Sequence, residues 1–380
     1  MSASSPTPTL TRADYISADV FELERRRIFH GGWFFVGHVA SIPAGSSRVL
    51  DVAGEQVIVT CTRAGQFHAF ANACRHRGAM LVDPTDPTVV APECGAASIQ
   101  CPYHAWTYGL DGRLLATPRV NRADVDRDAT GLWAYRADVW NGLVFVSLAH
   151  DVAPLREWLV ESNPALVGFE HLAIADMALV QRTASSAAAN WKIVVENYQE
   201  CLHCPVVHPE LVEVIPHYRT GEVVDAARPD GAVEFLNGAN SYMQASTGAA
   251  ELPLLPGVAP SDEGVYNGTS VFPNLFFDLT ASGLVLTTLF PVDPDRTLIV
   301  GEYLFAPEVA ASSEYDPTDE IAFNELIGAQ DIAVCERVQR GVASRAFTTG
   351  ILTTKDDAVV DFDRQYRSAM DPLAHPFQIT

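Results

Sequence analysis

The spacing of apolar residues divides the first part of the chain into one helical stretch and several strands. Residues 14–30 follow a helical pattern, with its apolar positions at Val20, Phe21, Leu23 and Ile28. Strand signals then extend from Trp33 to about residue 148, in three runs at residues 48–59, 66–71 and 143–146. Residues 109–113 predict a turn between strands. We therefore expect a mainly β-structured domain after a short helical start.

The pattern after residue 150 alternates between helix and strand. A helical piece is expected at residues 154–160, a strand at 178–184, and a helix that begins at the N-cap Asn190 and is obstructed by Pro205 and Pro209. Three apolar runs separated by turns predict an antiparallel sheet, at residues 275–277, 284–289 and 298–305. Residues 325–341 predict an amphipathic helix, with Ile327, Val334 and Val338 near its apolar stripe.

Composition narrows the class of protein. The chain has 380 residues, enough for two domains with separate cores, and a formal net charge of −22. That charge repels phosphate backbones, so we expect no nucleic-acid partner and favour a basic protein surface instead. No apolar run is long enough to span a bilayer, and residues 1–11 are polar. Seven cysteines, an odd number at low density, favour a reducing compartment, so we expect a cytoplasmic protein without membrane attachment.

Two short segments carry a metal-cluster signature. Cys74 and His76 lie in the first, and Cys101 and His104 in the second, within the run Cys-Pro-Tyr-His-Ala-Trp. Tetrahedral zinc also accepts two Cys and two His, but zinc fingers usually group Cys with Cys. One Cys and one His from each segment allow a [2Fe-2S] cluster to take both thiolates on one iron and both imidazoles on the other, which favours a Rieske centre. Cys94 has no His at the matching offset and is interpreted as an ordinary thiol in an insert.

A second group of residues predicts a mononuclear metal site. Glu200 and His203 are three residues apart and would share a helical face, whereas His208 lies about 140° around an ideal helix from His203, so the backbone must distort there. Two imidazoles and one carboxylate form the facial set that holds non-haem Fe(II) with open positions. Asp331, close to the apolar stripe of its helix, is the favoured carboxylate over four acidic residues expected in the preceding loop: Glu314, Asp316, Asp319 and Glu320.

The runs at residues 190–209 and 331–341 resemble the catalytic domain of Rieske non-haem iron oxygenase alpha subunits, a family of aromatic-ring-hydroxylating dioxygenases and quaternary-ammonium monooxygenases. The resemblance extends over nearly the whole chain and implies an α+β fold. It implies an all-β Rieske domain at residues 33–150 and a helix-grip, START-like catalytic domain at residues 151–380, with an antiparallel sheet and covering helices. Residues 1–32 would form an N-terminal segment that packs on the catalytic domain. The stretch between the cluster segments is longer than the family commonly has.

The same resemblance assigns roles to residues. It implies that Cys74, His76, Cys101 and His104 hold the [2Fe-2S] cluster and that the mononuclear Fe(II) is bound by three residues: His203, His208 and Asp331. Glu200 would be the catalytic carboxylate that links this iron to the cluster of a neighbouring subunit, which implies a ring, expected to be a homotrimer. The family's electrons come from NAD(P)H through a separate ferredoxin-type reductase, and O2 is the co-substrate.

The substrate is predicted less directly. Glu at position 200, followed by Cys-Leu-His-Cys-Pro, resembles the branch that hydroxylates or N-demethylates quaternary ammonium and other small N-methyl compounds. Four aromatic residues could face such a cation: Tyr198, Tyr242, Phe276 and Phe277. Relatives acting on betaine-like compounds often carry a His-Pro-Asp-Tyr-like run where this chain has Leu-Thr-Ala-Ser-Gly, so an aromatic acid is an alternative substrate. A different class also fits, a Rieske electron-transfer protein with a catalytically silent ligand-binding domain, and a zinc-binding regulator is a third.

Overall fold

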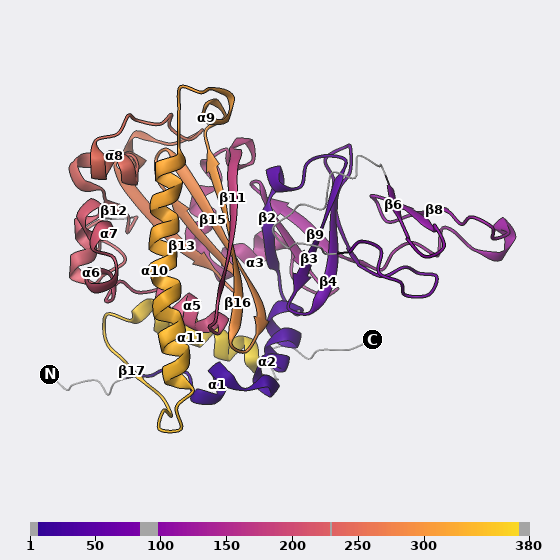
Figure 1. The fold of residues 1–380 in the computed structure, drawn as a ribbon, viewed down its shortest axis with the longest axis horizontal. Coiled ribbons are helices and arrows are strands. Elements are labelled where there is room, and N and C mark those ends of the chain that lie inside the picture. Colours follow the sequence, from indigo (N-terminus) through magenta and orange to yellow (C-terminus); the bar gives the residue numbers. More distant parts are fainter. Residues whose placement is uncertain (1–6, 84–97, 229, 372–380) are drawn as a thin grey trace. The chain divides into compact units, whose positions relative to one another are not determined.

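The computed structural model describes residues 7–83, 98–228 and 230–371 (Figure 1). Cys94 and almost all of the insert between the two cluster segments lie outside these residues. The chain divides into two compact units. One comprises residues 29–158, and the other comprises residues 1–28 together with residues 159–380.

The 29–158 unit is built on a six-stranded antiparallel sheet in the order β2-β10-β9-β5-β4-β3. Its strands are β2 (Phe34–His38), β3 (Ser46–Val52), β4 (Glu55–Cys61), β5 (Phe67–Ala71), β9 (Ala134–Trp140) and β10 (Leu143–Ser147). The run at residues 48–59 is two strands, because Ala53 and Gly54 take positive φ angles and turn the chain back on itself. β10 is buried along its whole length, as its continuous apolar run predicts.

A smaller three-stranded sheet in the same unit carries the second cluster segment between β6 and β7, whereas the first segment follows β5 of the larger sheet. The smaller sheet contains β6 (Ser98–Gln100), β7 (Thr107–Gly109) and β8 (Leu114–Ala116), in that order. The turn between β7 and β8 requires glycine at Gly112, where φ is +79° and a Cβ atom would lie 2.3 Å from the ring of Phe70. The short helices of this unit are η2 (Val39–Ser41) and η3 (Arg122–Asp124).

The second unit contains another six-stranded antiparallel sheet, in the order β11-β16-β15-β14-β13-β12. Its strands are β11 (Ala178–Ala187), β12 (Val233–Glu234), β13 (Val265–Val271), β14 (Leu275–Leu279), β15 (Gly283–Asp293) and β16 (Arg296–Phe305). The three runs expected from the sequence are β14, β15 and β16. β13 escaped the sequence pattern because only its two ends are buried, with polar and small residues between them.

Helices cover one face of this sheet, with the long helix α10 (Thr318–Val342) lying across it in Figure 1. α10 packs on α5 (Trp191–Tyr198), and α5 in turn contacts β15. α10 begins seven residues earlier than the predicted start at residue 325, so Asp319 and Glu320 belong to its first turn and not to a loop. The predicted apolar stripe was partly wrong, because Val338 is 42 % exposed, whereas Cys335 and Gln339 are buried.

The remaining elements complete the two units. They are α1 (Arg12–Ile16), α2 (Ala18–Glu24), η1 (Arg25–Phe29), α3 (Leu155–Ser162), α4 (Pro164–Gly168), η4 (Phe169–His171), η5 (Ile174–Asp176), α6 (Cys204–Val207), α7 (Pro209–Val214), η6 (Pro216–Thr220), η7 (Leu236–Gly238), α8 (Tyr242–Thr247), η8 (Pro260–Asp262), α9 (Pro307–Ala311), α11 (Asp357–Met370) and the strand pair β1 (Thr7–Pro8) and β17 (Ile351–Leu352). None of the helices in the described part of the chain is both long and apolar enough to cross a membrane.

A buried ion pair joins the N-terminal helices to α5. Lys192 and Glu24 are both fully buried, and the Lys192 ammonium donates to the Glu24 carboxylate. Trp191 and Tyr366 donate two further hydrogen bonds to that carboxylate, each 2.8 Å long. The apolar pattern expected Leu23 to be inside, but Leu23 is 40 % exposed and its charged neighbour is buried instead. The apolar pattern of α2 alone therefore does not determine which face of the helix is buried, because the ion pair of Glu24 also contributes.

Two candidate metal sites

The two cluster segments form one site in the 29–158 unit, with sulfur inside and nitrogen outside. The thiols of Cys74 and Cys101 are 1 % and 2 % exposed, whereas His76 is exposed and His104 half-buried. The two Nδ1 atoms of these imidazoles lie 3.2 Å apart. A [2Fe-2S] cluster needs this asymmetry, with one iron on two buried thiolates and the other on two outward imidazoles, so the residues present fit that group.

The backbone of the two segments follows the same hydrogen-bonding pattern. The amide of Cys74 donates to the Ala79 carbonyl and the amide of Gly78 returns to the Cys74 carbonyl, at 2.8 and 2.9 Å. In the second segment the amide of Cys101 donates to the Trp106 carbonyl at 2.8 Å, and the amide of Ala105 donates to the Cys101 carbonyl at 3.0 Å. The fourth residue after each Cys has a positive φ angle, +71° at Gly78 and +56° at Ala105. Each His is thus presented by a tight loop of fixed shape.

Tyr108 is a further polar residue of this site that the motif did not reveal. Its hydroxyl lies 3.3 Å from the Cys74 sulfur and accepts a hydrogen bond from the backbone N–H of Arg75 at 3.2 Å. Burial raises the pKa of the Cys74 thiol, while the hydrogen bond to Tyr108 acts in the opposite direction. Hydrogen bonds to metal-bound sulfur tune cluster potentials, so Tyr108 is positioned to do so here.

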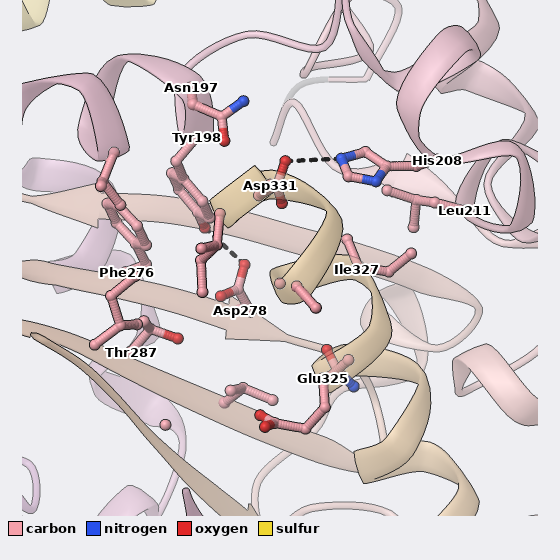
Figure 2. A pocket seen from close by; sticks show the side chains of 18 of the residues that line it. Asn197, Tyr198, His208, Leu211, Phe276, Asp278, Thr287, Glu325, Ile327 and Asp331 are labelled. Carbon is pink, nitrogen blue, oxygen red and sulfur yellow. Dashed lines mark hydrogen bonds and ion pairs between the residues drawn. The ribbon is translucent and has the colours of Figure 1, made fainter. Parts of the chain in front are cut away.

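The second site joins three residues from two helical regions of the other unit. The metal-binding atoms of His203, His208 and Asp331 lie within 4.8 Å of one another. Asp331 Oδ1 is 3.3 Å from His203 Nε2 and 2.8 Å from His208 Nε2, and Figure 2 shows the His208 contact. Both imidazoles therefore turn the same ring nitrogen toward one carboxylate oxygen. Two neutral imidazoles and a carboxylate suit a divalent iron, so these residues fit such an ion.

The opposite ring nitrogens are held by hydrogen-bond acceptors. His203 Nδ1 lies 2.6 Å from Glu200 Oε1, and His208 Nδ1 lies 2.7 Å from Gln330 Oε1. The amide nitrogen of Gln330 donates a hydrogen bond to Glu210 at 3.2 Å, and this second contact orients the Gln330 side chain. Such acceptors fix which nitrogen carries the proton and raise the basicity of the other. Gln330 was missed in the sequence, although its position next to Asp331 on the helix is the signal that could have found it.

The local fold that presents these histidines differs from the sequence prediction. α5 ends at Tyr198, so Glu200 and His203 meet through a turn and not along a helical face. Pro205 and Pro209 lie in the first turns of α6 and α7 and do not interrupt a helix, because the first turn needs no proline N–H. A disulfide between Cys201 and Cys204 spans His203. The distortion that brings His203 and His208 together is therefore a break at residues 199–202 followed by two short helices.

The carboxylates of Asp331 and Glu200 favour binding of a positive charge, either a proton or a metal ion, at the second site. Burial acts to lower the pKa of His203, but hydrogen bonds to Asp331 and Glu200 outweigh it and raise that pKa to about 9. Burial likewise acts to raise the pKa of Asp331, and the two histidines outweigh it and lower that pKa. Binding of a divalent cation by these three residues would therefore compete with protonation of His203.

A cavity of about 290 Å³ opens beside these donors, between α5, α10 and the sheet. Its wall includes His203, His208 and Asp331 together with several aromatic rings. Three of the four aromatic candidates line it, namely Tyr198, Tyr242 and Phe276. Phe277 does not, because alternate residues of β14 face opposite sides of the sheet, and its buried ring stacks on Phe169 instead, at 5.4 Å between centroids.

The cavity also contains an acidic residue that the sequence analysis missed. Asp278 on β14 accepts hydrogen bonds from the hydroxyls of Tyr198, at 2.7 Å, and of Tyr266. Figure 2 shows Asp278 in the wall between Phe276 and Asp331. Burial raises the pKa of Asp278 to about 6, and the two tyrosine hydrogen bonds partly oppose that rise. Its neighbours in sequence are apolar, and only strand alternation placed it on the cavity side.

Comparison with protein families agrees with this geometry. Residues 32–133 match the Rieske [2Fe-2S] domain, and residues 174–372 match the catalytic domain of the ring-hydroxylating alpha subunit. A Rieske domain joined to a catalytic domain of antiparallel sheet and covering helices defines a Rieske-type oxygenase, an oxidoreductase whose cofactors are a [2Fe-2S] cluster and a mononuclear iron. The chain belongs to the ring-hydroxylating alpha-subunit family.

Curated relatives match nearly the whole chain. The glycine betaine monooxygenase oxygenase subunit of Pseudomonas aeruginosa is 27 % identical, over 95 % of this chain and 89 % of its own length. The carnitine monooxygenase oxygenase subunit of Acinetobacter pittii is 26 % identical, over 89 % of this chain and 86 % of its own length. The solved structure of a quaternary ammonium Rieske monooxygenase, described in work on carnitine oxidation by gut microbiota, superimposes with a TM-score of 0.77 at 23 % identity and covers 96 % of both chains.

Proposed function

We propose that this chain is a terminal oxygenase component that uses O2 and electrons from a ferredoxin-type reductase to hydroxylate or N-demethylate a small quaternary ammonium or N-methyl compound. The observation that carries the proposal is the facial set of His203, His208 and Asp331 at the wall of a small aromatic cavity. The activities named for the glycine betaine and carnitine relatives support it. A cavity of about 290 Å³ is near the lower end of the range for ligand pockets, which suits a small substrate.

In this proposal the donors have separate roles. Cys74, His76, Cys101 and His104 would hold the [2Fe-2S] cluster, while His203, His208 and Asp331 would hold the iron. When bound, the cluster supplies electrons one at a time and the ferrous ion supplies oxygen activation. Glu200 keeps the proton of His203 on Nδ1 and leaves Nε2 free to bind metal. The aromatic rings exclude water and turn their negative faces toward an ammonium group.

Hydroxylation and demethylation share a first step. One methyl C–H bond, O2, two electrons and two protons give an N-hydroxymethyl group and one water molecule. The N-hydroxymethyl group of a quaternary ammonium then loses formaldehyde, leaving a tertiary amine and a proton. The reductase supplies both electrons, so no oxidant other than O2 is required.

We also propose that electrons pass between neighbouring subunits of a homotrimer through Glu200. Glu200 lies at the edge of the iron site, with its side chain 17 % exposed and one oxygen on His203. Its other oxygen accepts a hydrogen bond from the backbone N–H of Leu202. The partly exposed edge of the carboxylate would receive a further donor from a neighbouring chain, and an imidazole such as His104 of that chain is the expected one. Work on the quaternary ammonium relative describes inter-subunit electron transfer, which supports this arrangement.

Metal analysis combined with oxygen uptake tests the proposed function. We expect the purified chain to contain two cluster irons and one mononuclear iron. His208→Ala should lose only the mononuclear iron and all substrate-dependent O2 uptake, while keeping the visible spectrum of the cluster. His171→Ala, at an exposed position of the same unit, is the matched control. A wild-type chain with only the two cluster irons and no O2 uptake would instead indicate an electron-transfer protein with a silent ligand-binding domain.

A further inference from the structure

Apart from the two histidines of the proposed iron site, the ionisable Asp, Glu, Lys and Arg side chains that line the cavity are all acidic. Four carboxylates line it, contributed by Glu200, Asp278, Glu325 and Asp331. Among the described residues that line it, none is Lys or Arg. Two of these carboxylates already belong to the iron site, through His203 and His208. Asp278 and Glu325 remain to meet the substrate.

Glu325 is the less suited of the two. It is exposed, and it accepts hydrogen bonds from Thr183, at 2.9 Å, and from Tyr303. Solvent screens an exposed charge, so its influence on a bound ligand is weak. Asp278 by contrast is partly buried on β14. The hydroxyls of Tyr198 and Tyr266 both donate to its Oδ1 atom, so neither hydroxyl occupies its Oδ2 atom.

Aromatic rings surround Asp278 on the cavity side. The ring of Tyr198 stacks on Phe276 with centroids 4.0 Å apart, and the ring of Tyr266 lies 6.2 Å from that of Tyr242. Gly268 makes room for Tyr266, because a Cβ atom at Gly268 would lie 2.5 Å from the Tyr266 hydroxyl. A cation beside Asp278 would therefore meet a carboxylate and ring faces together, in a low-dielectric wall where both attractions are strong.

Resting on the proposed function, we infer that Asp278 determines substrate charge: the site takes a small ammonium compound with a net charge of +1 and rejects one that also carries a carboxylate. A substrate carboxylate would enter a cavity whose described lining offers no basic partner and would be repelled by Asp278. The relatives' named substrates, glycine betaine and carnitine, combine an ammonium group with a carboxylate. The inference thus separates this chain from them and also excludes aromatic acids.

Three probes of similar size test the inference. Choline and glycine betaine differ in whether an alcohol or a carboxylate stands opposite the trimethylammonium group, and 3,3-dimethyl-1-butanol is the uncharged counterpart of choline. Binding to the anaerobic, iron-loaded protein is measured by calorimetry. We expect choline to bind at least about tenfold more tightly than either of the other two, a difference in the range of one well-placed charge interaction.

Variants at Asp278 show whether this carboxylate is responsible. Asp278→Asn keeps the shape and should weaken choline binding about tenfold or more, with less than about a threefold change for 3,3-dimethyl-1-butanol. Tyr266→Phe keeps the ring but removes one hydrogen bond, and should weaken choline selectively by a few-fold. Asp295→Asn, at an exposed turn of the same unit, should change nothing.

The outcomes distinguish this inference from the proposed function. Equal weakening of all three probes by Asp278→Asn, tighter binding of glycine betaine than of choline, or no saturable binding of choline at millimolar concentration would each overturn the role of Asp278. If glycine betaine is bound and drives O2 uptake, the proposed function stands and only the inference fails. If choline binds through Asp278 but the iron-loaded protein shows no substrate-dependent O2 uptake, the inference stands and the proposed oxygenase function fails.

Discussion

The two histidines of the proposed iron site are oriented by hydrogen bonds on the side of each ring that faces away from Asp331. Glu200 and Gln330 each hold one Nδ1 atom, and this turns both Nε2 atoms toward Asp331. Of these two acceptors only Glu200 carries a charge, and its side chain is 17 % exposed. The two acceptors should therefore differ in function, with Gln330 restricted to orientation.

Replacing Glu200 with Gln should slow turnover about tenfold to a hundredfold while both metal centres stay bound, in the range seen for such outer partners. The amide keeps the shape and an acceptor oxygen for His203 but loses the negative charge. Iron content, steady-state O2 uptake and single-turnover reoxidation of the reduced cluster are the measurements. Glu213→Gln, exposed on α7, is the control. Unchanged single-turnover reoxidation would remove Glu200 from the electron path.

The pKa of Asp278 predicts a stability change with pH. Burial raises this pKa from 3.8 to about 6 in the folded protein. A raised pKa means that the carboxyl contributes stability below about pH 4, and that this contribution, about 3 kcal/mol in total, is lost as the pH rises through 6. Asp278→Asn has no such loss. Its unfolding free energy relative to wild type should rise by about 1 to 2 kcal/mol between pH 5 and pH 8.

Urea unfolding at several pH values measures this difference. Tyr198 and Tyr266, the hydroxyls that face Asp278, have pKa values raised well above 10 by burial, so they stay protonated in this range. The exposed variant Asp295→Asn should show a flat difference from wild type. A flat difference for Asp278→Asn as well would mean that Asp278 is solvated as in the unfolded chain. Asp278→Asn would thus gain stability above pH 6 and lose affinity for a cation for the same reason, the absence of the negative charge of Asp278.

At the scale of helices and strands, sequence pattern predicted the elements better than their ends. β10, β14, β15 and β16 follow from continuous or alternating apolar runs. The ends went wrong where proline was read as a terminator, because Pro205 and Pro209 begin short helices. The contacts of Gln330 and Asp278 were missed, since their partners lie far away in sequence and depend on how α10 and β14 pack against the segment around α5. Only Gln330 had a local signal, its place next to Asp331.

The buried pair between α2 and α5 predicts a large effect of one substitution. Lys192→Met should lower the free energy of unfolding by about 3 to 5 kcal/mol, because Glu24 would stay buried without a positive partner. Adding Glu24→Gln should restore much of that loss, since the uncompensated charge disappears. Lys355→Met, whose ion pair is 42 % exposed on the lysine side, should cost less than about 1 kcal/mol. Urea unfolding of the four proteins measures the differences.

The difference in unfolding free energy between Lys192→Met and the double variant shows whether an unpaired buried charge is the cause of the destabilisation. Equal losses for Lys192→Met and for the double variant would mean that lost packing, and not unpaired charge, destabilises the protein. α5 leads directly into the turn that holds Glu200 and His203. Iron content should therefore fall together with stability in Lys192→Met.

At the scale of the whole molecule, the sequence predicted two units with one metal centre each, because the cluster donors lie in two compact segments and the two histidines of the iron site are five residues apart. The family matches agree with this at residues 32–133 and 174–372. The proposed hand-over of electrons between subunits rests on the family resemblance, which assigns the link to Glu200. Whether the electron comes from the cluster of the same chain or of a neighbouring chain is tested with oligomers that contain two different variants.

Co-expression of two differently tagged variants tests electron transfer between chains. His104→Ala should disable the cluster and His208→Ala the iron, so each variant alone should be inactive. In a closed ring of three chains, an iron site works if its own chain keeps His208 and the neighbouring chain keeps His104, which holds for about a third of the sites in every ring that contains both variants. We therefore expect oligomers purified through both tags to recover about a third of wild-type O2 uptake. Transfer within one chain predicts no recovery, because no chain then holds both working centres. Variants mixed only after separate purification should stay inactive.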